Sequence, residues 1–303
     1  MPAAPEKIEV THPERVVYPK AGYTKADVVG YYRTVSPYLV PALEGRPLSL
    51  QRWPSGLKGK GFFQQNLEDA PEWMSTASIE HSDRTVQHAL VSDARDLRWL
   101  ANRSVITLHM WSARTDALET PDWVVFDLDP AGEHFSEVLP LARSLRRLLE
   151  AAGLESIPKT SGKRGLHVLV PIARGPDHDQ VTAWARGITR VLARLHPELS
   201  TTERMKSKRR GRLYLDALQN GRGKTVVAPY SLRDTPQATY SAPLRWSEVN
   251  ARLDPGRFTL ANVKRRLDRV GDLFAPALRG RQTLPFLGSS RTGMDEEVEA
   301  PGP

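Results

Sequence analysis

Two carboxylates stand two residues apart at the end of an apolar run. In PDWVVFDLDP (121–130), Asp127 and Asp129 follow a stretch that includes Val124 and Val125 and favours a β-strand. Side chains alternate along a strand, so both carboxylates are expected on one face. Such a pair can hold hard divalent cations such as Mg²⁺ or Mn²⁺. Taken alone, the same letters also fit a strand that ends in a polar turn.

A second segment combines a turn with cations. In KTSGKRGLHVLVPI (159–172), backbone N–H groups, the Ser161 hydroxyl, Lys163 and Arg164 converge where a phosphate could sit. His167 lies just inside the strand that follows. An ordinary hairpin loop and a structural histidine are the alternatives for this segment taken alone.

A third segment, RLYLDALQNGRGKTVVAPYSLR (212–233), supplies Asp216 on an expected strand, followed by Gln219 and Arg233. Its GKT does not form a P-loop. The first glycine of that motif would fall at Leu218, and the residues after GKT favour a strand rather than a helix.

Aromatic and histidine side chains precede these segments. The pair Phe62 and Phe63, flanked by Lys58, Lys60 and Arg52, could stack on nucleic-acid bases while the cations hold the backbone, although a core pair fits equally. His109 ends the strand expected in SVITLHM (104–110), where a core histidine is the alternative.

One stretch is strongly basic. RMKSKRRGR (204–212) places six cations in nine residues directly before the Asp216 segment, and could grip a phosphate backbone. A solvated loop is the alternative. The residues considered for DNA contact there are Lys206, Lys208, Arg209 and Arg210.

Composition narrows the classes of protein. The 303 residues carry a net charge of +8, which favours a polyanionic partner such as nucleic acid or nucleotide phosphates. The absence of cysteine excludes disulfides, Cys-ligated zinc, iron–sulfur centres and thiol catalysis. No apolar run of membrane-spanning length occurs and MPAAPEKIEV has no signal-peptide core, so a cytoplasmic protein is expected.

Strand and helix patterns alternate along the chain. This predicts an α/β or α+β class with a mixed sheet, in one domain over 1–286 with a disordered tail over 287–303. Helices are expected over 24–40 (capped by Thr24), 92–102 (capped by Ser92), 135–152 and 181–195, and strands over 46–53, 104–110, 121–130, 166–172, 212–218 and 224–232.

In their order and spacing, DLDP, SGKRGLHV, LDALQN and TVVAPYSLR resemble the polymerase domain of bacterial DNA ligase D, in the archaeo-eukaryotic primase superfamily. The resemblance runs from THPERVVYPKAGYTK (11–25) to SAPLRW (241–246). It implies a primase-type core of two packed, antiparallel-rich sheets surrounded by helices, working in non-homologous end joining.

The resemblance also implies residue roles. Asp127, Asp129 and Asp216 match the carboxylates that hold two Mn²⁺ or Mg²⁺ ions for nucleotidyl transfer. Positions implied for the incoming nucleotide, mainly its triphosphate, are His109, Ser161, His167 and Arg233. Lys163, Arg164 and Gln219 are expected to join them from their places in the same segments. For DNA, the resemblance implies Arg15 and Lys25 at a downstream 5′-phosphate, and Phe62 and Phe63 against template and nucleotide. Arg52 and the basic residues of 204–212 are expected at DNA from their charge.

The implied activity is addition of ribonucleotides, preferred over deoxyribonucleotides, to DNA 3′ ends. It covers gap filling, untemplated addition and end bridging at gapped or 3′-overhanging, 5′-phosphorylated ends. A Ku-type end-binding protein and a DNA ligase are the implied partners, in the bacterial cytoplasm at the nucleoid. Departures from the family pattern are Gln65 in place of a lysine, Gln51 where a basic residue is frequent, and Arg164 in place of a lysine.

Two other interpretations stay open. The chain shows no ligase or phosphoesterase segment, which fits an excised domain or a stand-alone primase-polymerase. A catalytically silent DNA end-binding protein could use the same basic surface, although extra carboxylates beside DNA would then gain nothing. A metal-dependent phosphoesterase is disfavoured because the histidines do not cluster at metal-ligand spacing.

Overall fold

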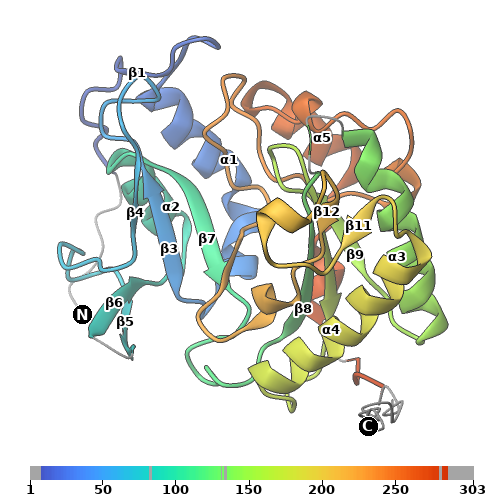
Figure 1. Ribbon diagram of the computed structural model, residues 1–303. Helices are drawn as coiled ribbons and strands as arrows, with labels where there is room; N and C mark the ends of the chain where they lie inside the picture. Colours follow the sequence, from blue (N-terminus) through green and yellow to red (C-terminus); the bar gives the residue numbers. More distant parts are fainter. Residues whose placement is uncertain (1–7, 82–83, 131, 133–134, 280–281, 286–303) are drawn as a thin grey trace, which may run out of the picture.

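The computed structural model describes residues 8–81, 84–130, 132, 135–279 and 282–285. Two antiparallel sheets lie beside each other with helices around them (Figure 1). The expected fold class, α/β with antiparallel-rich sheets surrounded by helices, is confirmed.

The larger sheet is drawn on the left of Figure 1 and has six strands. Its order is β13 (Thr225–Val227), β7 (Val105–Trp111), β3 (Leu48–Arg52), β6 (Thr85–Ala89) and β5 (Thr76–Glu80), with β4 (Phe62–Gln64) also paired to β3. Helices α1 (Lys25–Leu43) and α2 (Ala94–Asn102) pack on each other and belong to the same core as the sheet.

Alternation along β3 and β7 separates the two faces of this sheet. Leu50 and Leu108 pair in register and lie in the core with α1 and α2. The neighbouring pair, Ser49 and His109, therefore points to the opposite face. This opposite face carries the polar residues of both strands.

The smaller sheet has three strands in the order β8 (Trp123–Leu128), β10 (Leu166–Pro171) and β9 (Ile157–Thr160). Helices α3 (Val138–Ala151), which follows the 3₁₀ turn Phe135–Glu137, and α4 (His178–Leu195) cover one of its faces. Phe126 and Val168 point into the core formed with these helices. The other face is apolar at one end, where Val125 and Leu169 join the core of the larger sheet, and polar at the end that carries Asp127 and His167.

Shorter elements complete the described chain. They are β1 (Val16–Tyr18), β2 (Tyr23–Thr24), β11 (Ser200–Thr201), β12 (Leu213–Tyr214), α5 (Val263–Val270), α6 (Ala275–Arg279) and the 3₁₀ turns η2 (Lys206–Lys208), η3 (Ala217–Asn220), η4 (Trp246–Glu248), η5 (Pro255–Arg257) and η6 (Leu260–Asn262). None of the helices within the described ranges is long and apolar enough to cross a membrane.

Most expected elements are confirmed, with three differences. The strand expected over 224–232 ends at Val227, shortly before Pro229, which has no N–H to continue the ladder. Thr24 caps α1 through a capping box, but α2 is capped by Asp93 rather than Ser92, because the Asp93 carboxylate accepts from two backbone N–H groups of the first turn. The strand expected over 212–218 stops at Tyr214. The Asp216 carboxylate accepts from Leu218 N at 2.9 Å, which turns the chain into η3. The tail expected over 287–303 lies outside the described residues.

Candidate active site

Three polar side chains form a row across the smaller sheet. His167 on β10 is in register with Asp127 on β8 and with Lys159 on β9, so all three leave the same face. Lys159 Nζ lies 2.7 Å from His167 Nδ1 and 2.7 Å from Ser241 Oγ, and His167 Nε2 lies 3.4 Å from Asp127 Oδ1. Because the ammonium or amine hydrogens of Lys159 face Nδ1, we assign the imidazole proton to Nε2, which faces the carboxylate.

Burial dominates the electrostatics of the row. It lowers the pKa of Lys159 well below the usual value, and together with Lys159 it lowers the pKa of His167 to about 4. Burial alone would raise the pKa of Asp127, but the neighbouring His167 outweighs it and the net direction is down. At neutral pH, Asp127 is therefore an anion facing a neutral imidazole.

Asp129 continues the same face one step past the end of β8. Burial and the charge of Asp127 raise the pKa of its carboxyl, as expected for two carboxylates side by side. Gly165 lies against it, and a side chain there would collide with Asp129 Oδ1 and Leu128 O. The last glycine of SGKRG is thus required by the close approach of the turn to Asp129.

The turn before β10 uses Ser161 to hold its own shape. The Ser161 hydroxyl oxygen accepts from Gly165 N at 3.0 Å and Lys163 N at 3.3 Å. Gly162 has φ +74°, and its neighbours Arg233 and Ser241 leave no room for a side chain. The turn is therefore fixed, and the exposed Lys163 and Arg164 are presented at its tip.

A cavity of about 190 Å³ lies where the polar ends of the two sheets meet. The smaller sheet and its turn contribute the carboxylates and His167, whereas β7 and β13 of the larger sheet contribute the opposite wall. The lining residues are His109, Asp127, Asp129, Ser161, Lys163, Arg164, His167, Gln219, Thr225, Val226, Val227 and Arg233. Every residue that the sequence predicted for nucleotide contact lies in this one lining.

Cations line the same cavity as the carboxylates. Arg233 donates to Ser161 O at 3.2 Å, but its buried Nε has no hydrogen-bond partner. Lys163 Nζ pairs with Asp234 Oδ1 at 2.8 Å. Burial, with the charge of Arg233, lowers the pKa of His109 to about 3, and the buried His109 Nε2 also lacks a partner. Unpaired buried groups facing a polar cavity indicate that a bound ligand completes them.

Gln219 also lines the cavity, but its amide nitrogen is already used. Its Nε2 donates to Thr225 O at 2.6 Å, which ties η3 to β13. Only the side-chain oxygen of Gln219 remains free of a hydrogen bond among the contacts of the described residues.

Asp216 lies outside the lining of this cavity. Its Oδ1 accepts from Leu218 N and, at 3.4 Å, from Tyr214 OH, at the start of η3. The turn η3 itself is fastened to β8, because buried Asn220 accepts from Val125 N at 2.7 Å and donates to Val125 O at 3.0 Å. Asp216 is thus at the start of a turn that is fastened to the strand of Asp127, but the expected three-carboxylate site remains a prediction.

The Asp127 and Asp129 pair fits a divalent cation. Asp127 Oδ1 is buried without a hydrogen-bond partner, and Asp129 is a second carboxylate held beside it, so their mutual repulsion would be relieved by a cation. Across the described ranges, no group of three or more His, Cys, Asp or Glu side chains stands at ligating distance of one ion. Further ligands of a bound ion would thus come from the substrate, from water, or from side chains that move toward the ion.

The predicted aromatic pair is exposed, so the core-pair alternative is wrong. Phe62 is 46% exposed and Phe63 is 63% exposed on β4, and the Phe63 ring lies 5.4 Å from that of His109. Arg52 stands over Phe62 at 5.6 Å and donates to Gln64. An exposed ring next to the cavity is suited to stacking on a base.

The other side chains predicted to contact DNA differ in how exposed they are. Arg15 and Lys25 lie together, but Lys25 is buried and donates to Thr11 Oγ1 at 2.8 Å. Burial and the charge of Arg15 lower the pKa of Lys25. The basic segment 204–212 keeps Lys206, Lys208 and Arg210 exposed, whereas Arg209 stacks over Tyr214 at 4.0 Å.

Gln51 and Gln65, the two glutamines that depart from the family pattern, differ in their contacts. Gln51 lies in register with Phe63 and its amide nitrogen approaches Asp234 Oδ2 at 3.3 Å. Gln65 lies just after β4 and is half-buried. Gln51 is thereby tied to the carboxylate that also holds Lys163.

Sequence reasoning missed Lys159 and Asp234. Both are within two residues of groups that it did identify, but each acts through a partner: Lys159 orients His167, and Asp234 holds Lys163. A signal was available for Lys159, since it alternates in phase with Ser161 on the strand that leads into the turn. Asp234 follows Arg233 directly, and nothing in the letters indicates its contact with Lys163.

A family model described as the LigD primase-polymerase domain matches residues 24–274. The chain belongs to this family. It is 36% identical over 276 residues to the multifunctional non-homologous end joining protein LigD of Mycolicibacterium smegmatis, and 33% identical over 283 residues to the bifunctional LigD of Bacillus subtilis. These matches cover 89% and 92% of the chain but 36% and 46% of the relatives, so this LigD-type chain spans less than half of either.

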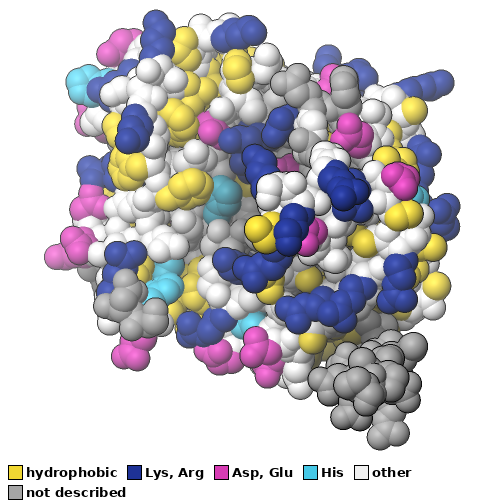
Figure 2. Space-filling view, viewed as in Figure 1, with side chains coloured by type: hydrophobic (Ala, Val, Ile, Leu, Met, Phe, Trp, Pro, Cys, Tyr) yellow, Lys and Arg dark blue, Asp and Glu magenta, His cyan; other side chains and the backbone are white. Residues whose placement is uncertain are grey.

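A solved structure agrees with the assignment. The polymerase domain of Mycobacterium tuberculosis ligase D, in complex with DNA, superposes with a TM-score of 0.85 at 30% identity, covering 91% of this chain and all of that one. Figure 2 shows the face of the LigD-type chain seen in Figure 1. Lys and Arg side chains gather over β12, β11 and α4, beside hydrophobic side chains toward β4. The resemblance seen in the sequence is therefore confirmed at the level of family and fold.

Proposed function

We propose that this chain is a primase-type polymerase of non-homologous end joining, which adds nucleotides to DNA 3′ ends. The observation that carries the proposal is that Asp127 and Asp129 line one cavity together with Arg233, Lys163 and Arg164. The carboxylates suit metal ions and a 3′-hydroxyl, and the cations suit a triphosphate. The family and the DNA complex of a relative support the same conclusion.

The residues of the cavity would have different roles in the reaction, depending on where they lie. Arg233 and His109 offer unpaired buried nitrogens to phosphate oxygens, and Arg164 adds a cation at the rim. His167, oriented by Lys159, would turn its Nε2–H toward Asp127 Oδ1 and so help to hold that carboxylate. This preorganised arrangement would favour charge that builds up on phosphate in the transition state.

Asp127 and Asp129 would hold divalent ions, with Asp216 as the further carboxylate of a two-ion site. When bound, Mn²⁺ or Mg²⁺ would neutralise negative charge on the triphosphate and lower the pKa of the primer 3′-hydroxyl. The structure supports the first two ligands through the unpartnered Asp127 oxygen and its paired neighbour. Asp216 rests on the family resemblance and on its place beside β8.

Substrates and partners follow from the same proposal. The exposed Phe62 and Phe63 suit stacking on the template, and Arg15 with Lys25 would meet a downstream 5′-phosphate at gapped or 3′-overhanging ends. Ribonucleotides would be preferred over deoxyribonucleotides, and the chain would fill gaps, add untemplated nucleotides and bridge ends. A Ku-type protein and a ligase would act with it at the nucleoid in the bacterial cytoplasm.

One observation favours a second candidate, a catalytically silent end-binding protein. Asp216 Oδ1 is engaged by Leu218 N and lies outside the cavity lining, so the complete set of carboxylates is not assembled in this arrangement. Such a protein would bind ends through the basic segment 204–212 without turnover.

Extension of a gapped DNA with a 5′-phosphate separates the two candidates. Wild type, Asp127→Ala and Asp216→Ala are compared in Mn²⁺ with ribo- or deoxyribonucleotides, with Asp179→Ala, an exposed carboxylate on α4, as the control. The polymerase proposal expects primer growth by wild type and the control, a loss on the order of a thousandfold in both site variants, and faster growth with ribonucleotides. Binding by wild type without extension in either nucleotide set would establish the end-binding candidate instead.

A further inference from the structure

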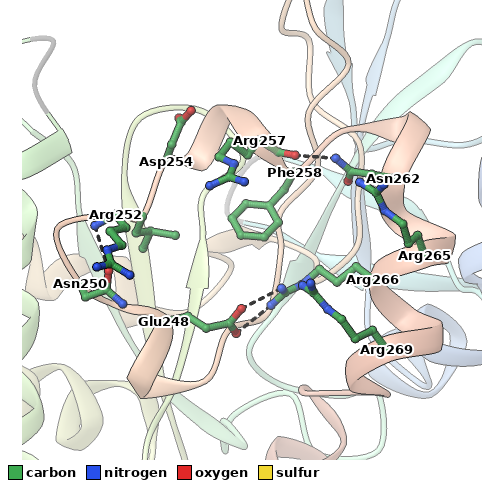
Figure 3. Close-up of a pocket in the computed structure, with 11 residues that line it drawn as sticks. Glu248, Asn250, Arg252, Asp254, Arg257, Phe258, Asn262, Arg265, Arg266 and Arg269 are labelled. Carbon is green, nitrogen blue, oxygen red and sulfur yellow. Dashed lines mark hydrogen bonds and ion pairs between the residues drawn. The ribbon is translucent and has the colours of Figure 1, made fainter.

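A second cavity, of about 510 Å³, opens away from the site, between the loop after η4 and helix α5. Figure 3 shows arginines reaching it from both sides. We call it the arginine pocket; it is lined by Glu248, Asn250, Arg252, Leu253, Asp254, Arg257, Phe258, Asn262, Arg265, Arg266 and Arg269. None of these residues lines the cavity that holds Asp127.

The lining has a large excess of positive charge. It contains five arginines and two carboxylates, Glu248 and Asp254. One arginine is neutralised, because Arg266 forms a two-pronged ion pair with Glu248 at 2.8 and 2.9 Å. The other four arginines are exposed, and their side chains have no acidic partner among the described residues; they are Arg252, Arg257, Arg265 and Arg269.

The floor of the pocket is rigid. Arg266 is only 9% exposed, stands over the Phe258 ring at 4.8 Å and donates to Pro243 O at 3.0 Å. Phe258 in turn packs its ring against Tyr240. The free arginines therefore surround a fixed base, so they can close on a ligand without reorganisation of the fold.

The spacing of the arginines suits several anionic groups at once. Arg265 and Arg269 stand one turn apart on α5, where Cβ atoms are about 5–6 Å apart, and Arg252 and Arg257 face them from the loop. Guanidinium forks match the oxygens of phosphate in two-pronged contacts. A cavity of this size, within the roughly 300–1,000 Å³ range of ligand sites, accommodates more than one phosphate.

Phosphate fits the pocket better than an acidic peptide does. A bound peptide needs apolar anchors as well as charge, and the pocket offers only Leu253 and a Phe258 ring whose face Arg266 already covers. We propose that the arginine pocket binds a run of closely spaced phosphates, in a nucleic-acid strand or in a nucleotide polyphosphate. This binding is separate from the proposed polymerase reaction, so its test does not need activity.

The test pairs two double variants of equal charge. Arg265→Gln/Arg269→Gln empties one side of the pocket, and Arg186→Gln/Arg190→Gln removes two exposed arginines with the same spacing on α4. Arg266 is kept because it is buried against Glu248. Unchanged thermal unfolding of both variants confirms that they are folded.

Binding of a 20-nucleotide single-stranded DNA and of inorganic tripolyphosphate is measured without divalent ions over a range of salt. Loss of two strand contacts predicts an affinity lower on the order of tenfold for the pocket variant, with a salt-dependence slope reduced by about 1.4. The control variant should show a smaller loss of affinity and a smaller change in the salt-dependence slope. A deficit confined to tripolyphosphate would identify a nucleotide polyphosphate as the source.

Two outcomes overturn the proposal. Equal binding of both probes by the pocket variant and the control would show that the arginines contact no phosphate. Binding by wild type of an acidic peptide, with no difference between variants on either phosphate probe, would do the same. Because catalysis is not measured, failure of the polymerase proposal would leave this result interpretable.

Discussion

Lys159 and His167 lie side by side on neighbouring strands, with Nζ 2.7 Å from Nδ1. Both side chains are buried, and Ser241 Oγ accepts the other hydrogen bond of the lysine while donating to Thr160 O. The lysine thus fixes the ring from behind, so that Nε2 faces Asp127. This relationship links the stability of the smaller sheet to the geometry of the site.

Replacing Lys159 with methionine should change how stability depends on alkaline pH. Burial lowers the pKa of Lys159 in the folded state, so the folded protein binds fewer protons than the unfolded one and wild-type stability rises as pH increases toward 10.5. Lys159→Met removes that rise. Urea unfolding of wild type and variant between pH 7 and 9.5 measures the difference, with the exposed Lys20→Met as control. A parallel rise in wild type and Lys159→Met would show that the lysine is charged in the folded protein.

His109 should destabilise the fold in acid. Its folded-state pKa of about 3 lies below the usual 6.5, so the stability present above pH 6.5 is lost as pH falls toward 3, at roughly 1.4 kcal/mol per pH unit. His109→Gln should flatten this loss by that amount, seen by urea unfolding at pH 4.5, 5.5 and 7. The half-exposed His196→Gln serves as control. An unchanged acid slope in His109→Gln would mean that the imidazole is protonated in place.

The sequence predicted which residues line this site better than it predicted which of them contact one another. The period of two in VVFDLDP placed Asp127 and Asp129 on one face, and the turn residues of SGKRG located a loop that lines the cavity. Strand register joins Lys159 to His167 over eight residues, and a side-chain ion pair joins Lys163 to Asp234 over a much longer stretch of chain. Register depends on pairing between distant segments, and a single sequence does not reveal it.

Asp216 illustrates the same limit in a shorter segment. The apolar alternation of RLYLDAL predicted a strand, but the Asp216 carboxylate captures Leu218 N and starts a 3₁₀ turn. A side chain that competes for backbone N–H groups can outweigh a weak β pattern. The exposure of Phe62 and Phe63 was likewise undetermined by local pattern, because adjacent residues point to opposite faces of β4 and both faces lie open here.

Asn220 should be important for both stability and the site. Its side chain pairs with both backbone groups of Val125, two residues before Asp127, and Asn220→Ala leaves those buried groups without partners. We expect a loss of about 2–4 kcal/mol in the free energy of unfolding. Chemical unfolding measures it against Asn250→Ala, whose hydrogen bonds lie in an exposed loop. A loss below about 1 kcal/mol would mean that water replaces the amide.

Phe63 should contribute to DNA binding and almost nothing to stability. Its ring is 63% exposed and contacts the His109 ring, so Phe63→Ala removes little buried surface. If the ring stacks on a template base, the variant should bind gapped DNA more weakly by about 1–3 kcal/mol, with unfolding changed by less than about 0.5 kcal/mol. Fluorescence anisotropy compares it with Leu195→Ala, an apolar side chain 57% exposed on α4, and with Phe63→Trp, which retains an aromatic face. If the ring stacks on a base, wild type and Phe63→Trp should bind gapped DNA more tightly than Phe63→Ala, because any aromatic face can stack. Equal affinity of all three proteins would show that the ring does not contact DNA and only packs against His109.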